Sequence, residues 1–124
     1  EDALQRVSSN GFALSGVASE FRSDHEIVLA AVSKSGRALR FASTDLRSNL
    51  EIVLAAVSKH GDALKHAASG MRSDRDVVLA AVAQDGLSLA HAAEQLRDDR
   101  EVVLTATSQN GWALEHASRA CRRD

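Results

Sequence analysis

The sequence predicts an all-α protein, a right-handed α-solenoid built from five helix-turn-helix repeats of 25 residues. Two observations support this fold class. Glycines recur at a constant spacing of 25 residues, and the residues around them repeat as well. The composition is rich in alanine and contains no proline, which favours helices. The repeating glycines are Gly11, Gly36, Gly61, Gly86 and Gly111.

All 124 residues belong to the repeat pattern, so the sequence predicts a single domain. The predicted units are residues 1–24, 25–49, 50–74, 75–99 and 100–124. The first and last units carry polar residues, such as Arg6 and Thr107, where the middle units are apolar. Such polar ends are typical of terminal repeats, so we expect the chain to be close to a complete array.

Each unit is expected to begin with a helix of about eleven residues. A serine or aspartate precedes an acidic residue by three positions, which is the spacing of a capping box. The helix should end at the repeating glycine, whose freedom to adopt positive φ suits a left-handed cap. The predicted N-terminal caps are Ser23, Ser48, Ser73 and Asp98.

The apolar residues of this first helix, from Ile27 to Val32 and in its copies, point almost all the way round it. A second, shorter helix from Ala38 to about Leu46 has a single apolar stripe and keeps one side in water. Because one partner cannot cover the first helix, neighbouring units must stack on it. In this stack we expect Leu54 and Leu79 to be filled core positions.

Charge and cysteine content disfavour several functions. The net charge of −2, from 15 Lys+Arg and 17 Asp+Glu, provides no broad attraction to nucleic acid or anionic lipid. The longest apolar run is far too short to cross a bilayer, so no membrane insertion is predicted. The single cysteine, Cys121, has no partner for a disulfide or a cysteine zinc site, and we expect it to pack as a small hydrophobic residue.

Histidines occupy one column of consecutive units, at His66, His91 and His116, where an earlier unit has Phe41. Zinc requires nitrogen ligands that converge at about 2.0–2.1 Å, whereas stacked layers lie about 8–10 Å apart. We therefore predict that these histidines pack their rings along the array and bind no metal. Metal or proton chemistry is the alternative.

One column contains arginine in all five units. Because it directly precedes the predicted cap, each guanidinium can reach carbonyls at the end of the second helix or the acidic first turn of the next helix. This position predicts a structural latch, and the alternative is a line of arginines that binds a polyanion or an acidic partner. The column consists of Arg22, Arg47, Arg72, Arg97 and Arg122.

The column after the repeating glycine is predicted to be exposed, because it contains Arg, Asp, Leu and Trp in different units. Exposed aromatic residues are either ordinary surface residues or anchors for a partner. The position before the glycine lies on the same edge and is also variable. The predicted partner-binding residues on this edge are Phe12, Arg37, His60, Leu87 and Trp112.

The unit from Arg100 to Ser118 and its copies resemble the short helical repeats known as domain of unknown function 4116. The features that carry the resemblance are a charged first residue, Val-Val-Leu-Ala-Ala-Val, Asn-Gly and Ala-Leu-x-x-Ala-Ser at fixed spacing. The resemblance implies tandem repeats of the kind found in unicellular algae, other protists and some bacteria. It assigns no activity, cofactor or catalytic residue. The first unit departs from the pattern at Gly16, where the others have Phe or His.

An enzyme needs dissimilar groups brought together, whereas these repeats disperse like residues at even intervals. We therefore predict no enzymatic activity, no cofactor and no small-molecule substrate. A helical-repeat reader of nucleic acid would need a basic groove, which the net charge of −2 disfavours. The predicted function is a soluble intracellular protein-interaction module that binds another protein. The alternative is a permanently bound accessory subunit of a larger complex, such as one in a plastid or another organelle.

Overall fold

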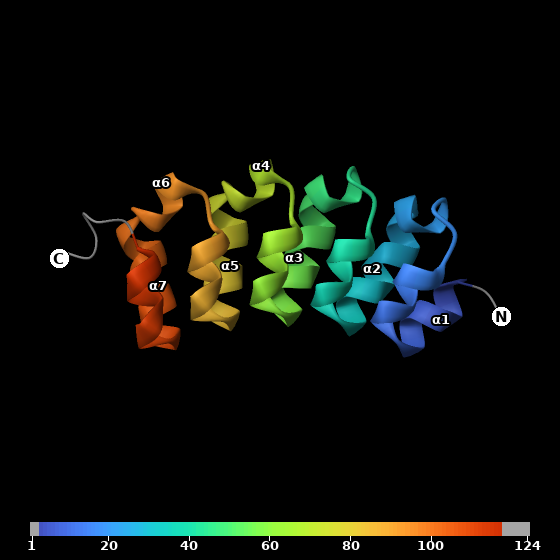
Figure 1. Ribbon diagram of the computed structural model, residues 1–124, viewed down its shortest axis with the longest axis horizontal. Coiled ribbons are helices and arrows are strands. Elements are labelled where there is room, and N and C mark those ends of the chain that lie inside the picture. Colours follow the sequence, from blue (N-terminus) through green and yellow to red (C-terminus); the bar gives the residue numbers. More distant parts are fainter. Residues whose placement is uncertain (1–2, 118–124) are drawn as a thin grey trace.

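The structure is a computed structural model that describes residues 3–117, and every regular element in this range is a helix. The helices follow one another in chain order from the N-terminal end on the right of Figure 1 to the C-terminal end on the left. None of the helices in the described range has the length and hydrophobicity needed to span a membrane.

Each unit contains an α-helix, a 3-10 helix and, in all but the last described unit, a short third helix. The α-helices are α1 (Ala3–Ser9), α2 (His25–Lys34), α3 (Leu50–Lys59), α5 (Arg75–Gln84) and α7 (Arg100–Gln109). The 3-10 helices that follow them are η1 (Gly11–Gly16), η3 (Gly36–Phe41), η5 (Gly61–His66), η6 (Gly86–His91) and η7 (Gly111–His116). The short helices are η2 (Phe21–Ser23), η4 (Leu46–Ser48), α4 (Ser69–Arg72) and α6 (Glu94–Arg97).

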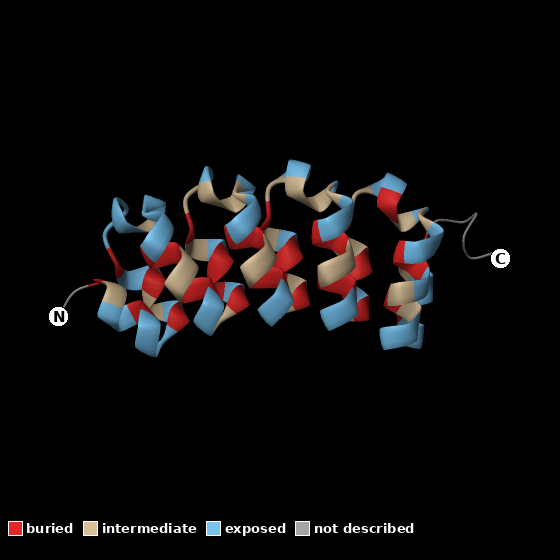
Figure 2. Cartoon of the chain, turned by 180° about the vertical axis from the view of Figure 1, so that it is seen from behind, coloured by how far each residue is buried: buried red, intermediate tan, exposed pale blue. Residues whose placement is uncertain are grey.

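The helices form two layers with the core between them. Each long α-helix contacts the next one along the chain, each 3-10 helix contacts the next, and the two layers contact each other. The short helices run along one edge, at the top of Figure 1. Buried residues lie in the middle of the array, and exposed residues line its two long edges (Figure 2). Each unit therefore completes the core of its neighbour.

The core uses four positions of each middle α-helix. In α3 these are Ile52, Val53, Ala56 and Val57, all with no exposed surface. Leu54 lies on the flank of the helix and is only half-buried. The expectation that Leu54 and its copy Leu79 are filled core positions is therefore wrong, because the two layers cover one broad face of the helix and leave the flank partly open.

The second element is a 3-10 helix and not the α-helix predicted from Ala38 to about Leu46. In η5, the buried residues Gly61 and Leu64 and the following Ala67 lie three positions apart, which matches three residues per turn. Ala67 then adopts an extended backbone with φ −75° and ψ 153°, and this ends the helix. Of the rest of the predicted helix, residues 42–45 are not helical, and Leu46 is the first residue of the separate short helix η4.

The caps of the α-helices lie one residue later than predicted. Ser73 has helical backbone angles (φ −99°, ψ −2°) because it closes α4, so it cannot serve as the cap of α5. Asp74 has extended angles (φ −85°, ψ 120°), and its carboxylate accepts a hydrogen bond from the Val77 N–H at 3.2 Å. The observed caps of the four longer α-helices are Asp24, Asn49, Asp74 and Asp99.

The repeating glycines do not form left-handed caps, since no glycine in the described range has positive φ. Their role is close approach. A Cβ atom on Gly36 would lie closer than 3.0 Å to the carbonyl oxygen of Ala56 in the next unit. The same clash would occur between Gly11 and Ala31, Gly61 and Ala81, and Gly86 and Ala106. Only a residue without a side chain lets successive units pack at this separation.

Hydrogen bonds also join successive units. The N–H groups of Ser43, Ala68 and Ala93 donate to the carbonyls of Arg22, Arg47 and Arg72 in the preceding units, at 2.9, 2.9 and 3.0 Å. At the glycines, the Gly36 N–H donates to His60 Nδ1 at 3.0 Å. The N–H groups of Gly61 and Gly86 donate to the side-chain oxygens of Gln84 and Gln109. Hydrogen bonds thus connect successive units along both long edges of the array.

We expect Gly36→Ala to lower the free energy of unfolding by about 1–3 kcal/mol, because the new methyl group would collide with backbone that cannot move aside. Gly111→Ala is the matched control, since a Cβ there would meet nothing within 4 Å. Urea denaturation of both variants measures the difference. Equal destabilisation by the two substitutions would contradict the close-approach role.

We also expect Leu64→Ala to cost about 2–5 kcal/mol of unfolding free energy, because this side chain has no exposed surface. Leu54→Ala should cost less, since Leu54 is half-buried. Thermal or urea unfolding of both variants measures the difference. A larger loss of unfolding free energy for Leu54→Ala than for Leu64→Ala would contradict the observed core.

Candidate functional site

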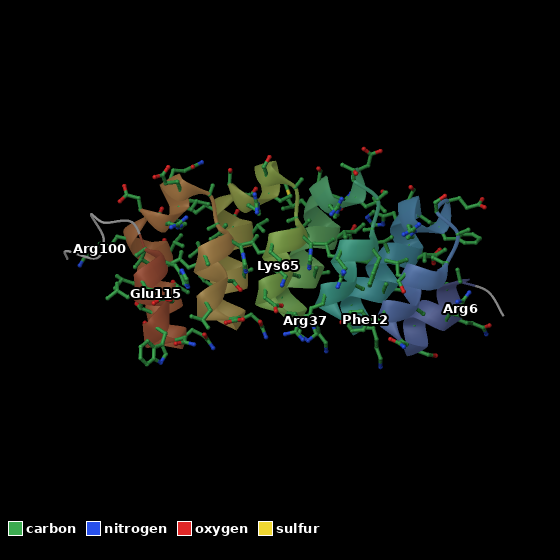
Figure 3. All side chains as sticks on the ribbon, viewed as in Figure 1. Arg6, Phe12, Arg37, Lys65, Arg100 and Glu115 are labelled. Atoms are coloured by element: carbon green, nitrogen blue, oxygen red, sulfur yellow. The ribbon has the colours of Figure 1, made fainter. Side chains whose placement is uncertain are left out.

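The candidate site is the turn edge, which we define as the residues on either side of each repeating glycine, where an α-helix turns into a 3-10 helix. The side chains of Phe12 and Arg37, which belong to neighbouring units, both lie toward the lower edge of the array in Figure 3. This edge is opposite the short helices. It therefore presents one variable residue per unit in a regular row.

Three of the turns are held by an Asn or Asp side chain that accepts a hydrogen bond from the N–H two residues later. These bonds join Asn10 to Phe12, Asp85 to Leu87 and Asn110 to Trp112, at 3.0, 3.1 and 2.9 Å. The same three turns carry the apolar residues of the column. The exposed fractions of these residues are 45% for Phe12, 40% for Leu87 and 79% for Trp112. A fixed backbone thus presents each apolar side chain to solvent.

The remaining two members of the column pair with each other. Arg37 Nε donates to both carboxylate oxygens of Asp62 in the next unit, at 3.1 Å each. The pair is partly exposed, so it contributes little to stability. It nevertheless gives this part of the edge a defined polar surface between the apolar positions.

Phe12 has a partner within the array. Its ring meets the ring of Phe41 edge-to-face, with centroids 6.3 Å apart and an angle of 83°. The guanidinium of Arg40 lies 5.1 Å from the centroid of Phe41. Such aromatic contacts hold Phe12 in one orientation while leaving part of it exposed.

His60 has a structural contact that the sequence pattern did not indicate. It is half-buried, and its Nδ1 accepts the hydrogen bond from the Gly36 N–H. Burial lowers the pKa of His60, and the nearby charge of Arg37 lowers it further. The neutral imidazole is therefore the form that joins these two units. Among the predicted partner-binding residues, Leu87 and Trp112 remain as exposed apolar side chains without a comparable internal contact among the residues described.

The histidine column is half-buried at His66, His91 and His116. Burial is the main cause that lowers the pKa of both His66 and His91. The contact of Phe41 with Phe12 shows how a ring in this column packs against the preceding unit. Within residues 3–117, no group of three or more His, Cys, Asp or Glu side chains is arranged to bind a metal ion.

The arginine column forms the predicted latch at one position. Arg97 Nε donates to the carbonyl oxygen of His116 at 2.8 Å, at the end of the 3-10 helix of the next unit. At Arg22, Arg47 and Arg72 the backbone carbonyl makes the bond between units described above. The sequence pattern could not reveal these bonds, because they depend on backbone and not on side-chain type. Arg122 and Cys121 lie outside the described residues.

The contacts between successive units define a tandem helical-repeat protein. Four overlapping segments, residues 1–47, 31–72, 49–97 and 74–120, match the family described as domain of unknown function (DUF4116). The chain belongs to this family, as the resemblance of its repeats indicates. No curated protein and no solved structure shows a significant match to the chain.

The lowered histidine pKa values predict that the protein loses stability in acid. The unfolded chain takes up protons near the ordinary histidine pKa of about 6.5, whereas the folded protein takes them up at lower pH. The contribution of these histidines to the free energy of unfolding is therefore fully present above pH ~6.5. It is lost as the pH falls from there through the lowered pKa values of His60, His66 and His91. Urea unfolding measured between neutral pH and pH ~5 tests this direction.

The variant His91→Phe places in this column the residue type found at Phe41. At neutral pH it should change the free energy of unfolding by less than about 1.5 kcal/mol. Its stability should also fall less steeply in acid than that of the parent protein, because one lowered pKa has been removed. An unchanged or steeper acid dependence would contradict the assignment.

Proposed function

We propose that the chain is a right-handed α-solenoid of five 25-residue repeats that acts as a non-enzymatic protein-interaction module. The clash-limited approach of glycine and carbonyl at four successive junctions supports a constant step between units. The turn edge is its contact surface, and the partner is another protein. Neither a cofactor nor a small-molecule substrate is part of this proposal.

The observation that carries the proposal is the row of exposed apolar side chains on the turn edge, above all Trp112 at 79% exposure. Tryptophan is among the residue types most enriched at binding hot spots. The Asn110 side chain already holds the backbone at Trp112, so little ordering is needed when a partner binds. A rigid backbone with exposed apolar anchors is suited to recognition of a complementary surface.

The alternative is a permanently bound accessory subunit of a larger complex. It is favoured by a concentration of exposed apolar residues in the last unit, where Leu104 and Leu114 are 53% and 43% exposed in addition to Trp112. Such residues on one unit are typical of a surface that is covered by another chain. The two proposals differ in how the isolated protein should behave.

The behaviour of the purified chain distinguishes them. A transient module should be monomeric at all concentrations tested, and iodide should quench the fluorescence of its single tryptophan freely. A permanent subunit should aggregate with rising concentration, and its partner should relieve the aggregation. Size-exclusion chromatography with light scattering, together with iodide quenching, provides both measurements.

We expect Trp112→Ala to reduce partner binding at least about tenfold, because an anchor residue contributes 2 kcal/mol or more. Stability should be unchanged, since the side chain is largely exposed. The matched control is Leu50→Ala, which removes another exposed apolar side chain at the start of α3, away from the turn edge.

The experiment immobilises the parent protein and both variants, exposes them to extract of the native source, and quantifies bound proteins by mass spectrometry. A protein retained by the parent and by Leu50→Ala but depleted with Trp112→Ala supports the turn edge. Equal retention of that protein by all three chains would show that Trp112 does not contribute to the interface.

A further inference from the structure

A hollow of about 250 Å³ lies between the second and third units, near the edge that carries the short helices. Its polar lining comes from Thr44, Arg47, Lys65, His66 and Arg72, and the remaining lining residues are alanines. Arg47 belongs to η4 and Arg72 to α4, while Lys65 and His66 end η5. Three elements that are separate in the sequence therefore bring three cations and a histidine to one opening.

No carboxylate lines this hollow. Elsewhere the chain balances such charges, as Arg37 does with Asp62 and Arg75 with Asp99. Within residues 3–117, no acidic side chain forms an ion pair with any of the cations of the hollow, Arg47, Lys65 and Arg72. Like charges held close together without a counterion favour the binding of an anion.

The pKa of His66 reflects the same positive environment. Its pKa is lowered first by burial and then by the charges of Lys65, Arg40 and Arg47, while Asp62 acts in the opposite direction. Two cations of the hollow, Lys65 and Arg47, therefore both act on this imidazole. An anion placed among them would offset their effect on the imidazole.

Neighbouring junctions lack this combination. In the next junction Ala90 takes the place of Lys65, and the arginine equivalent to Arg72 is Arg97, which already donates to the carbonyl of His116. In the preceding junction Arg40 takes the place of Lys65, but Phe41 takes the place of His66, and the guanidinium of Arg40 lies 5.1 Å from the centroid of the Phe41 ring. Three cations together with a histidine therefore occur at this junction and at neither of its neighbours, although the backbone repeats.

We propose that this hollow binds a phosphate monoester group. Two guanidinium groups can each offer a pair of parallel N–H donors to phosphate oxygens, Lys65 adds a compact charge, and the Thr44 hydroxyl adds a neutral donor. A phosphate monoester carries about −1.5 to −2 charges near pH 7, which the three cations of the hollow can neutralise. Free inorganic phosphate is not an ester, but it presents the same dianionic phosphate oxygens as a phosphorylated side chain of another protein.

A single phosphate fits the site better than a nucleic-acid backbone. A strand requires a basic track over several units, whereas the column that contains Arg40 and Lys65 begins with Ser15 and continues with Ala90 and Glu115. The proposal is also independent of the turn edge. The short helix α4 lies on the upper edge in Figure 1, and Phe12 and Arg37 lie toward the lower edge in Figure 3.

The test follows the imidazole signals of the full chain by NMR during pH titrations, at constant ionic strength, with His66→Phe used to assign His66. The ligands are inorganic phosphate, a short peptide containing phosphoserine, and the same peptide with glutamate in its place. Binding of phosphate should raise the pKa of His66, because a proton and an anion at one site favour each other. The signal of His25, on α2 and outside the lining, should not respond.

The matched variants are Lys65→Ala and Lys59→Ala. Both remove one lysine from the third unit, but Lys59 is exposed at the end of α3 and does not line the hollow. Alanine is the natural residue at the position equivalent to Lys65 in the next unit, Ala90, so the fold accepts it. Lys65→Ala and Arg72→Gln should each weaken phosphate binding at least about tenfold, and Lys59→Ala should change it less than about twofold.

The three ligands distinguish the possible sources of the bound phosphate group. Binding of both phosphate and the phosphoserine peptide assigns the site to phosphorylated side chains, and binding of phosphate alone assigns it to the free ion. Equal binding of the glutamate peptide, or equal weakening by Lys59→Ala, would overturn the proposal in favour of diffuse charge attraction. Tighter binding of a single-stranded oligonucleotide than of the phosphoserine peptide would overturn it in favour of a polyanion surface. Circular dichroism establishes that each variant is folded before binding is measured.

Discussion

The close approach between each repeating glycine and a backbone carbonyl of the next unit is the constraint on which the rest of the structure depends. The carbonyl oxygen of Ala56 occupies the space that a Cβ of Gly36 would need, and three further junctions repeat this contact. With that distance set, the valines and alanines of successive α-helices form one continuous buried core between the layers. The hydrogen bond from the Gly36 N–H to His60 also requires this proximity.

The same constraint explains how one backbone carries different surfaces. Since the core positions are occupied by small and medium apolar residues in every unit, with the buried Ser88 as an exception, most variation is left to the two long edges (Figure 2). On the turn edge, the column after the glycine changes from an Arg37–Asp62 pair to the exposed Leu87 and Trp112. On the edge of short helices, Lys65 in one unit is replaced by Ala90 in the next. The exposed side chains therefore differ from junction to junction, while the packing of the core residues stays the same.

Much of the local structure could be predicted from the sequence. The spacing of 25 residues, the position of the α-helices, the exposure of Trp112 and the membership of the family all follow from residue types at fixed intervals. The predicted caps lie one residue before the observed ones because Ser73 and Asp74 are both good capping residues, and only their backbone angles distinguish them. The sequence predicts an α-helix in place of the 3-10 helix because Leu39, Ala42 and Leu46 lie at spacings of three and four, which also form one face of an α-helix.

The sequence by itself determined that the chain repeats, that it is helical, and which columns are apolar, because these properties depend on composition and local periodicity. The tertiary structure decided why the glycines recur, that Leu54 lies on a flank, and that Arg47 and Arg72 meet Lys65 around one hollow. These features depend on distances between units, which arise only when the layers pack. A pattern along one chain contains the residues of such a site but not their separation in space.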